Sequence, residues 1–190
     1  MEEGAAGHRR GALGGRPAGG RLALALHVAL IEPQIPPNTG NIARLCAATE
    51  TSLHLIEPLG FALDDAELRR AGLDYWDAVD AWVHPTWRHF REAIARERCW
   101  YFSAHGEQSL WEAAIPDGAC LVFGNETVGL PQRIRDKHPE RVFRIPMTGP
   151  VRSLNLATAV GIVLYDVLKG LRAGATSTTP HRGERAGAEL

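Results

Sequence analysis

The sequence predicts an α/β protein whose mainly parallel sheet is flanked by helices. Short β-like runs recur along the chain, and most of them are followed by a helical or loop segment. Alternation of this kind is typical of a parallel sheet covered by helices, with ligands bound at the carboxyl ends of the strands. A chain of 190 residues is long enough for one compact domain with a sizeable core and too short for two ordinary ones.

Six apolar runs are expected to form the strands, because they are short and bounded by turn residues. In chain order they read HVALIE from His27, SLHLIE from Ser52, AWVH from Ala81, CWYFSA from Cys99, ACLVFG from Ala119 and VFRIP from Val142.

Helices are expected at residues 39–50, 64–71, 86–97 and 154–171. Asn38 or Thr39 is expected to cap the first of them, because short polar side chains accept hydrogen bonds from the free amides of a helix start. The last helix is apolar on nearly every face as far as Asp166. It therefore needs burial all round, either in the core or against another subunit.

The two ends of the chain show no apolar period. Residues 1–21 are rich in Gly, Ala and Arg, and residues 172–190 in small, polar and charged residues, so both ends are expected to be disordered. The folded domain is then expected to span residues 22–171. No apolar run has the length of a membrane span, and the first residues lack the apolar stretch of a secretory signal, so a cytoplasmic protein is expected.

Composition excludes some classes of function more firmly than it indicates others. The formal net charge is −1, so charge alone does not indicate nucleic-acid binding. Cys46, Cys99 and Cys120 are far apart and each lies in an apolar stretch, so buried free thiols are expected rather than a zinc site or disulfides. The absence of G-x-G-x-x-G, G-x-x-x-x-G-K-[ST], H-E-x-x-H and G-x-S-x-G disfavours dinucleotide folds and P-loop NTPases.

The first candidate loop, residues 32–41, contains three prolines and leads into a predicted helix. Prolines restrict the backbone, so this stiff turn delivers Asn38 and Asn41 to the helix start. Arg44 lies three residues after Asn41 and shares its face of the helix. An amide and a guanidinium there could hold phosphate or ribose oxygens; the alternative is a capped helix with a solvent-facing arginine.

Two further loops each follow a predicted strand. In residues 124–131, two glycines five positions apart permit close approach of the backbone to a planar or anionic ligand, although an ordinary turn would need them too. In residues 145–155, two prolines and a glycine next to Arg152 make a rigid polar rim around a helix start. Ser153 or Asn155 would cap that helix on the simpler interpretation.

Taken together, PPNTGNIARLC, LVFGNETVGLP and IPMTGPVRSLNLATAVGIVLYD resemble the three ordered motifs of the SPOUT methyltransferases, in the branch that methylates the ribose of tRNA or rRNA. LHLIEPLGF followed by LRRAGLDYW further resembles the minimal subgroup that methylates the 2′-oxygen of nucleotide 34, a cytidine or modified uridine, in certain leucine tRNAs. The resemblance covers roughly residues 26–171.

The resemblance implies a fold that neither composition nor periodicity predicts. The C-terminal part of the sheet would form a deep trefoil knot, against which general topology rules argue strongly. S-adenosylmethionine would bind bent within the knot, no metal is expected, and the protein would be a homodimer whose catalytic residues reach across the interface. The positions that match the family's cofactor pocket are Phe102, Gly124, Ile145, Met147 and Ser153.

The resemblance also implies a catalytic set. The methyl group of a sulfonium is already a strong electrophile, so the enzyme must align it with the ribose 2′-oxygen and ease loss of the hydroxyl proton. Arg44 matches the family arginine proposed for the second task, and because arginine stays charged we expect it to stabilise the developing alkoxide. Other matching positions, which shape the cofactor and ribose sites, are Asn38, Glu126, Ser153 and Asn155.

The implied RNA partner is the anticodon stem-loop of tRNA. Tyr75 and Trp76 could stack on loop bases, and a basic surface could form across a dimer, although such residues are ordinarily solvated helix faces and partly buried aromatics. The basic residues concerned are Arg69, Arg70, Arg88, Arg91, Arg133, Arg135, Lys137 and Arg144. Two alternatives stay open: the same chemistry on rRNA or another tRNA position, and an RNA-binding homologue without catalysis.

Overall fold

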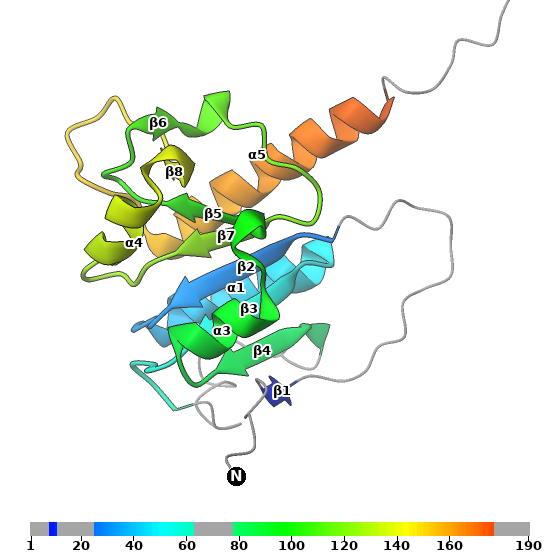
Figure 1. Ribbon diagram of the computed structural model, residues 1–190, viewed down its shortest axis with the longest axis vertical. Coiled ribbons are helices and arrows are strands. Elements are labelled where there is room, and N and C mark those ends of the chain that lie inside the picture. Colours follow the sequence, from blue (N-terminus) through cyan, green and yellow to red (C-terminus); the bar gives the residue numbers. More distant parts are fainter. Residues whose placement is uncertain (1–7, 11–24, 63–77, 177–190) are drawn as a thin grey trace, which may run out of the picture.

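The computed structural model describes residues 8–10, 25–62 and 78–176 of the chain (Figure 1). Its sheet has eight strands in the order β1-β4-β3-β2-β7-β5-β8-β6. The strands β2 to β8 pair in parallel, and only β1 pairs in the antiparallel sense, with β4. The prediction of a mainly parallel sheet is therefore confirmed.

All six expected runs form strands. The strands are β2 (His27–Ile31), β3 (Ser52–Ile56), β4 (Ala81–His84), β5 (Cys99–Phe102), β7 (Cys120–Phe123) and β8 (Val142–Arg144). The sequence patterns did not indicate two others, β1 (His8–Arg10) and β6 (Gln108–Ser109). β1 lies within residues 1–21, so part of the expected leader is a strand; it covers the edge of β4, whose backbone groups would otherwise lack partners.

The first helix, α1 (Pro36–Thr49), begins three residues earlier than expected. Pro36 and Pro37 occupy its first turn, where a missing amide proton costs nothing. Ile35 is the capping residue and makes no side-chain hydrogen bond to the helix, so the prediction that Asn38 or Thr39 caps it is wrong. Both side chains are instead buried inside the first turns of the helix.

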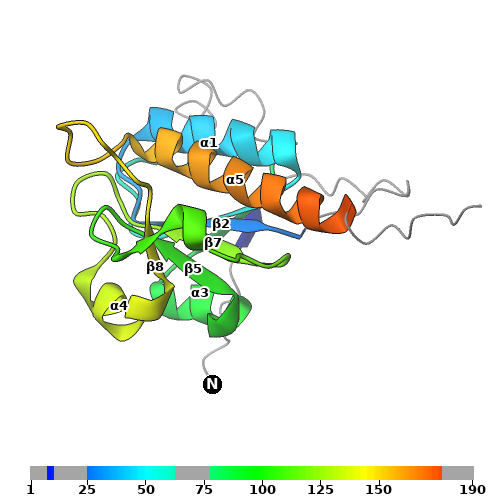
Figure 2. The same ribbon diagram turned by 90° about the horizontal axis from the view of Figure 1, so that it is seen from above.

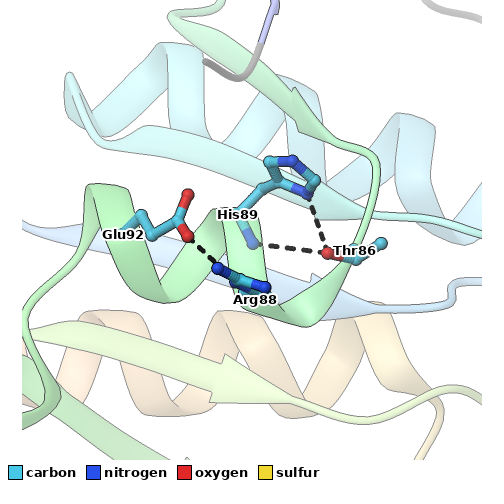
Figure 3. A network of polar contacts seen from close by, with 4 residues as sticks. All are labelled: Thr86, Arg88, His89 and Glu92. Carbon is cyan, nitrogen blue, oxygen red and sulfur yellow. Dashed lines mark hydrogen bonds and ion pairs between the residues drawn. The ribbon is translucent and has the colours of Figure 1, made fainter. Parts of the chain in front are cut away.

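The helix expected over residues 86–97 is shorter, because α3 (Trp87–Ala93) ends where Ile94 adopts an extended conformation and enters the core. Figure 3 shows its start: Thr86 accepts a hydrogen bond from the amide of His89 at 3.3 Å, and Arg88 pairs with Glu92 at 3.2 Å. The described residues also form the short 3₁₀ helices η2 (Arg96–Arg98), η3 (Leu110–Glu112) and η4 (Pro139–Arg141). The helix expected at residues 64–71 lies outside the described residues.

Helices cover both faces of the sheet. In Figure 2, α1 and α5 (Leu156–Thr176) lie side by side on one face, whereas α3 and α4 (Gln132–Lys137) lie on the other. Each face has its own apolar cluster, one around Leu30 and Val160 and one around Ala29 and Phe90. α5 runs to Thr176, past the expected domain boundary at residue 171.

α5 is not buried all round in the single chain. Val160, Val163 and Leu164 pack into the core, but Ile162 and Tyr165 are exposed, Tyr165 by 56%. All three cysteines are buried and free, as predicted. Within the described part of the chain, no helix is both long and apolar enough to cross a membrane.

Candidate active site

A cavity of about 650 Å³ opens at the carboxyl ends of β5, β7 and β8. Its walls come from the segments that follow these strands and from the start of α1. Because the strands are parallel, the loops at their carboxyl ends all reach the same edge of the sheet, which is where ligands bind in such folds.

The five positions expected to bind a cofactor line this one cavity. They are Phe102, Gly124, Ile145, Met147 and Ser153. Phe102 stacks on Phe123 with their ring centroids 5.0 Å apart, and both rings are buried at the ends of neighbouring strands. Ile35 and Asn38 of the first loop line the cavity too, so the three candidate loops, widely separated in sequence, converge on a single site.

The glycines of the second loop are needed for its shape. A side chain on Gly124 would collide with the backbone of Gly129 and Leu130. Gly129 itself has φ of 71°, a left-handed conformation that glycine adopts without strain. Asn125 closes the loop by accepting hydrogen bonds from the amides of Thr127 and Val128 at 3.1 and 2.7 Å. The close approach expected at Gly124 is thus made by the loop's own backbone.

A polar network ties the three loops together. The carboxylate of Glu126 accepts hydrogen bonds from the amide of Gln34 at 2.9 Å, the amide of Ile35 at 3.3 Å and Nδ2 of Asn38 at 3.0 Å. The other side-chain atom of Asn38, Oδ1, accepts a hydrogen bond from Nδ2 of Asn155 at 2.9 Å. Asn38, Glu126 and Asn155 come from the first, second and third loops, so these hydrogen bonds hold the three loops together.

Asn155 has a second task, since its Oδ1 accepts hydrogen bonds from the amides of Ala157 and Thr158 at 2.9 and 3.3 Å. It therefore caps α5, as the simpler interpretation of the third loop predicted. The Glu126 carboxylate already accepts hydrogen bonds from three protein donors, so its contacts order the loops around the cavity.

Arg44 and Asn41 do not lie on the cavity. Both are exposed on α1, and neither side chain is among the lining residues of the same chain. The charged side chain that does reach the cavity from the third loop is Arg152, whereas Ser103, Ala104 and His105 line it from the segment after β5. The sequence patterns missed these three residues, although their place directly after a strand could have indicated them.

The residues expected to contact RNA are only partly described. Arg88 and Arg91 lie on α3, and Arg133, Arg135 and Lys137 on α4, two helices that cover the side of the sheet opposite α1 and α5 (Figure 2). Arg144 instead donates to the carbonyls of Gly106 and Glu107. Arg69, Arg70, Tyr75 and Trp76 lie outside the described residues. In the described part of the chain, no group of three or more metal-ligating side chains is gathered.

Residues 25–165 match the model of the SpoU rRNA methylase family, and the chain belongs to this family. It is 47% identical over 147 residues to the tRNA (cytidine(34)-2'-O)-methyltransferase of Escherichia coli strain K12, a match that covers 77% of this chain and 94% of that protein. The enzyme of the same name from Saccharophagus degradans is 47% identical over 146 residues, covering 76% of this chain and 95% of its own length.

Solved structures agree with this assignment. One, described as structural insights into the 2-OH methylation of C/U34 on tRNA, is 48% identical, covers 80% of this chain and 99% of its own, and superposes with a TM-score of 0.75. The AdoMet-bound rRNA methyltransferase from Sinorhizobium meliloti is 26% identical, covers 77% and 57% of the two chains, and gives a TM-score of 0.67. The resemblance found in the three motifs is therefore confirmed.

Proposed function

We propose that this protein transfers a methyl group from S-adenosylmethionine to the ribose 2′-oxygen of the wobble nucleotide, position 34, of leucine tRNAs. The observation that carries the proposal is the single cavity on which all three motif loops converge. The names of the relatives support the substrate: two enzymes 47% identical to this chain are named for methylation of cytidine 34 in tRNA. We place this activity in the cytoplasm.

The cavity fits such a methyl donor. Its volume of about 650 Å³ lies in the range of ligand pockets, and Phe102, Ile145 and Met147 offer apolar surface for a planar base. When bound, S-adenosylmethionine supplies a methyl group on a positively charged sulfur, which needs no further activation. The AdoMet-bound relative at 26% identity supports this assignment.

We further propose that the loop after β8 completes a deep trefoil knot. The strand order supports it, because β8 lies between β5 and β6 and the chain then crosses to α5 on the other side of the sheet. In this arrangement Ile145 and Met147 would offer main-chain groups to the edge of the adenine. The Glu126, Asn38 and Asn155 network would keep the knotted loop in register with α1.

Arg44 is proposed to stabilise the alkoxide that forms on the ribose 2′-oxygen. Since Arg44 is absent from the cavity of its own chain, the proposal requires a homodimer in which α1 of one subunit brings its arginine to the cavity of the other. Ile162 and Tyr165 are exposed side chains of α5, which lies beside α1 (Figure 2). They support an interface on this face.

The RNA partner is proposed to be the anticodon stem-loop, which the dimer would bind without a separate RNA-binding domain. One alternative is the same reaction on rRNA or another tRNA position; the rRNA methyltransferase among the structural relatives favours it. The other alternative is an RNA-binding homologue that lacks activity. Against it stand the cavity and the intact network that surrounds it.

The deciding experiment incubates the purified protein with labelled S-adenosylmethionine and, separately, total tRNA and rRNA, followed by nucleoside mapping. Label on the 2′-oxygen of nucleotide 34 in leucine tRNAs is the expected result. Label in rRNA or elsewhere in tRNA would establish the first alternative. No transfer, together with no cofactor binding by calorimetry, would establish the second.

A further inference from the structure

Three histidines on neighbouring strands form a hydrogen-bonded series, here called the histidine chain, on the face of the sheet that α3 covers; none of them lines the cavity. His27 on β2 contacts His54 on β3 through Nδ1 and Nε2 at 3.0 Å. His54 contacts His84 on β4 in the same way, through Nδ1 and Nε2 at 2.9 Å. His54 and His84 are buried, with 4% and 0% of their surface exposed. The mechanism proposed above uses none of the three.

Arg98 determines where each ring carries its hydrogen. Its Nη2 lies 2.9 Å from Nε2 of His27, and a guanidinium can only donate, so this nitrogen must accept. His27 then carries its hydrogen on Nδ1 and donates it to Nε2 of His54. His54 in turn donates from Nδ1 to His84, which is left with its hydrogen on Nδ1. One contact thus fixes the tautomer of all three rings.

The histidine chain has no place for an additional proton. Each nitrogen-to-nitrogen contact already holds one hydrogen, so protonating the accepting nitrogen would put two hydrogens between the rings. The same holds at His27, where a proton on Nε2 would face the donor of Arg98. At the far end, Nδ1 of His84 is a buried nitrogen with no hydrogen-bond partner within the described part of the chain. Every protonation therefore breaks a contact.

The surroundings oppose a positive charge as well. Burial and the charge of Arg98 lower the pKa of His27 to about 4. Burial, His27, His84 and Arg98 lower the pKa of His54 to about 3. Asp80 acts in the other direction on His27 and His54. Burial and His89 of α3 lower the pKa of His84 to about 4.

Aromatic rings complete the enclosure of the chain. Phe90 of α3 meets the rings of His54 and His84 edge-on, with centroids 5.8 and 5.5 Å apart, and Trp82 stacks on His54 at 6.5 Å. The histidine chain therefore joins three strands to α3 as well as to one another.

The carboxyl ends of the same strands support the candidate active site. The amide of Glu57 donates to the carbonyl of His84 at 3.0 Å, and the amide of Glu32 donates to the carbonyl of Ile56 at 2.9 Å. Two residues further on, the amide of Gln34 donates to Glu126. A change at the end of β4 can thus reach the segment that holds the Glu126 carboxylate.

We propose that the histidine chain is an acid-sensitive lock, which holds β2, β3, β4 and α3 together only while all three rings are neutral and which loosens the Gln34 segment when it takes up a proton. The lock is a property of the fold and does not depend on which RNA the protein modifies.

The first test is the tautomeric state, read from long-range ¹H–¹⁵N correlations of protein labelled with ¹⁵N-histidine at about pH 7.5 and about pH 5.5. We expect the three rings to carry their hydrogen on Nδ1 and to stay neutral at both values. Their signals are assigned with single His→Gln variants. A hydrogen on Nε2 in any of the three, or a charged ring at the lower pH, would overturn the lock.

The second test is the pH dependence of unfolding. Because the folded state holds neutral rings, the stabilisation is complete above the unfolded pKa of about 6.5 and is lost as the pH falls toward 4. Between about pH 7.5 and 5.5 the unfolding equilibrium constant should rise about tenfold for each histidine, on the order of a thousandfold for the three.

His54→Gln removes one titrating ring and keeps an amide that can hydrogen-bond, so its rise should be about tenfold smaller than that of the wild type. His105 is exposed and does not belong to the histidine chain, so His105→Gln should show the same rise in the unfolding equilibrium constant as the wild type. If His54→Gln does not fold, His27→Gln at the partly exposed end allows the same comparison. An equal pH dependence of the unfolding equilibrium constant in the wild type and in the His54→Gln or His27→Gln variant would contradict the proposal.

The link to the active site has its own measurement. During acid titration, the amide signals of Gln34 and Ile35 should shift together with the ring signals of His84. Amide signals that stay constant while the rings change would show that the lock does not reach this segment.

Discussion

Asn38 shows that the role of a polar residue depends on which partners reach it. At a helix start its type indicates a cap, yet its side chain is 7% exposed and bridges Glu126 and Asn155. An asparagine can donate and accept at once. Glu126 needs a donor, which is Nδ2 of Asn38, and Nδ2 of Asn155 needs an acceptor, which is Oδ1 of Asn38. Leucine or alanine would leave both neighbours with one hydrogen bond fewer.

Asn38→Ala should therefore lower the free energy of unfolding by about 1–3 kcal/mol, because a buried network loses its central member. Asn41→Ala, an exposed asparagine of the same helix, is the matched control and should change stability by less than about 0.5 kcal/mol. Urea denaturation of both variants measures the difference. Similar losses in the two would show that the network does not stabilise the loops.

Arg44→Ala should lower the rate of methyl transfer about a hundredfold or more, because a charge that stabilises the transition state is lost. Cofactor affinity, measured by calorimetry, should stay unchanged, since the charge of Arg44 is needed for the alkoxide that forms during transfer and not for holding the donor. Arg96→Ala removes an exposed arginine of η2 that is not among the residues expected to contact RNA or cofactor, and it serves as the control. Transfer at the wild-type rate by Arg44→Ala would exclude this role.

At the scale of elements, the cavity depends on a loop with little freedom. The segment between β7 and α4 folds back on itself, so the backbone of Gly129 lies where a side chain of residue 124 would have to be. Its exposed tip, Val128, is held by the two hydrogen bonds that Asn125 accepts and by the pairing of Asn125 with Gly129. A single added methyl group must therefore displace the cavity wall.

Gly124→Ala should weaken binding of S-adenosylmethionine at least about tenfold, since a displaced wall loses contacts worth more than about 1.4 kcal/mol. Gly149→Ala is the matched control, because nothing lies within 4 Å of the added carbon. Calorimetry of both variants gives the comparison. Equal affinity in Gly124→Ala and the wild type would mean that the donor binds elsewhere.

At the scale of the whole molecule, the cavity and Arg44 belong to different parts of the surface, which is the basis for proposing a dimer with shared sites. A mixture of Arg44→Ala and Gly124→Ala subunits tests this arrangement. If each site combines residues of two subunits, the mixed dimer keeps one intact site, so random pairing should restore about a quarter of the wild-type activity. Sites built within one subunit would give no recovery.

The dimer surface can be tested separately. Tyr165→Asp places a charge among the exposed apolar side chains of α5 and should shift the protein toward monomers in sedimentation, by at least about tenfold in the dissociation constant. Trp111→Ser changes an exposed side chain of η3 and should not alter the association. A dimer of unchanged strength in Tyr165→Asp would place the interface on another face.

The positions of six strands, the three loops of the site and the family could all be predicted from the sequence. These features depend on short-range patterns: apolar runs specify strands, and glycines and prolines specify turns, wherever they occur. The start of α1 and the end of α3 were predicted less well, because both depend on distant parts of the chain. The amide of Ile35, which precedes α1, donates to Glu126. Ile94, which ends α3, is buried in the core.

The contacts between polar side chains could not be predicted from the sequence and emerge only in the folded protein. His27, His54 and His84 are 27 and 30 residues apart in sequence, and nothing in their local pattern predicts a hydrogen-bonded chain. Glu126 and Asn38 are separated by 88 residues, yet they lie 3.0 Å apart. Such contacts depend on strand order and register, which are set by the packing of the whole sheet and leave no periodic signal in the chain.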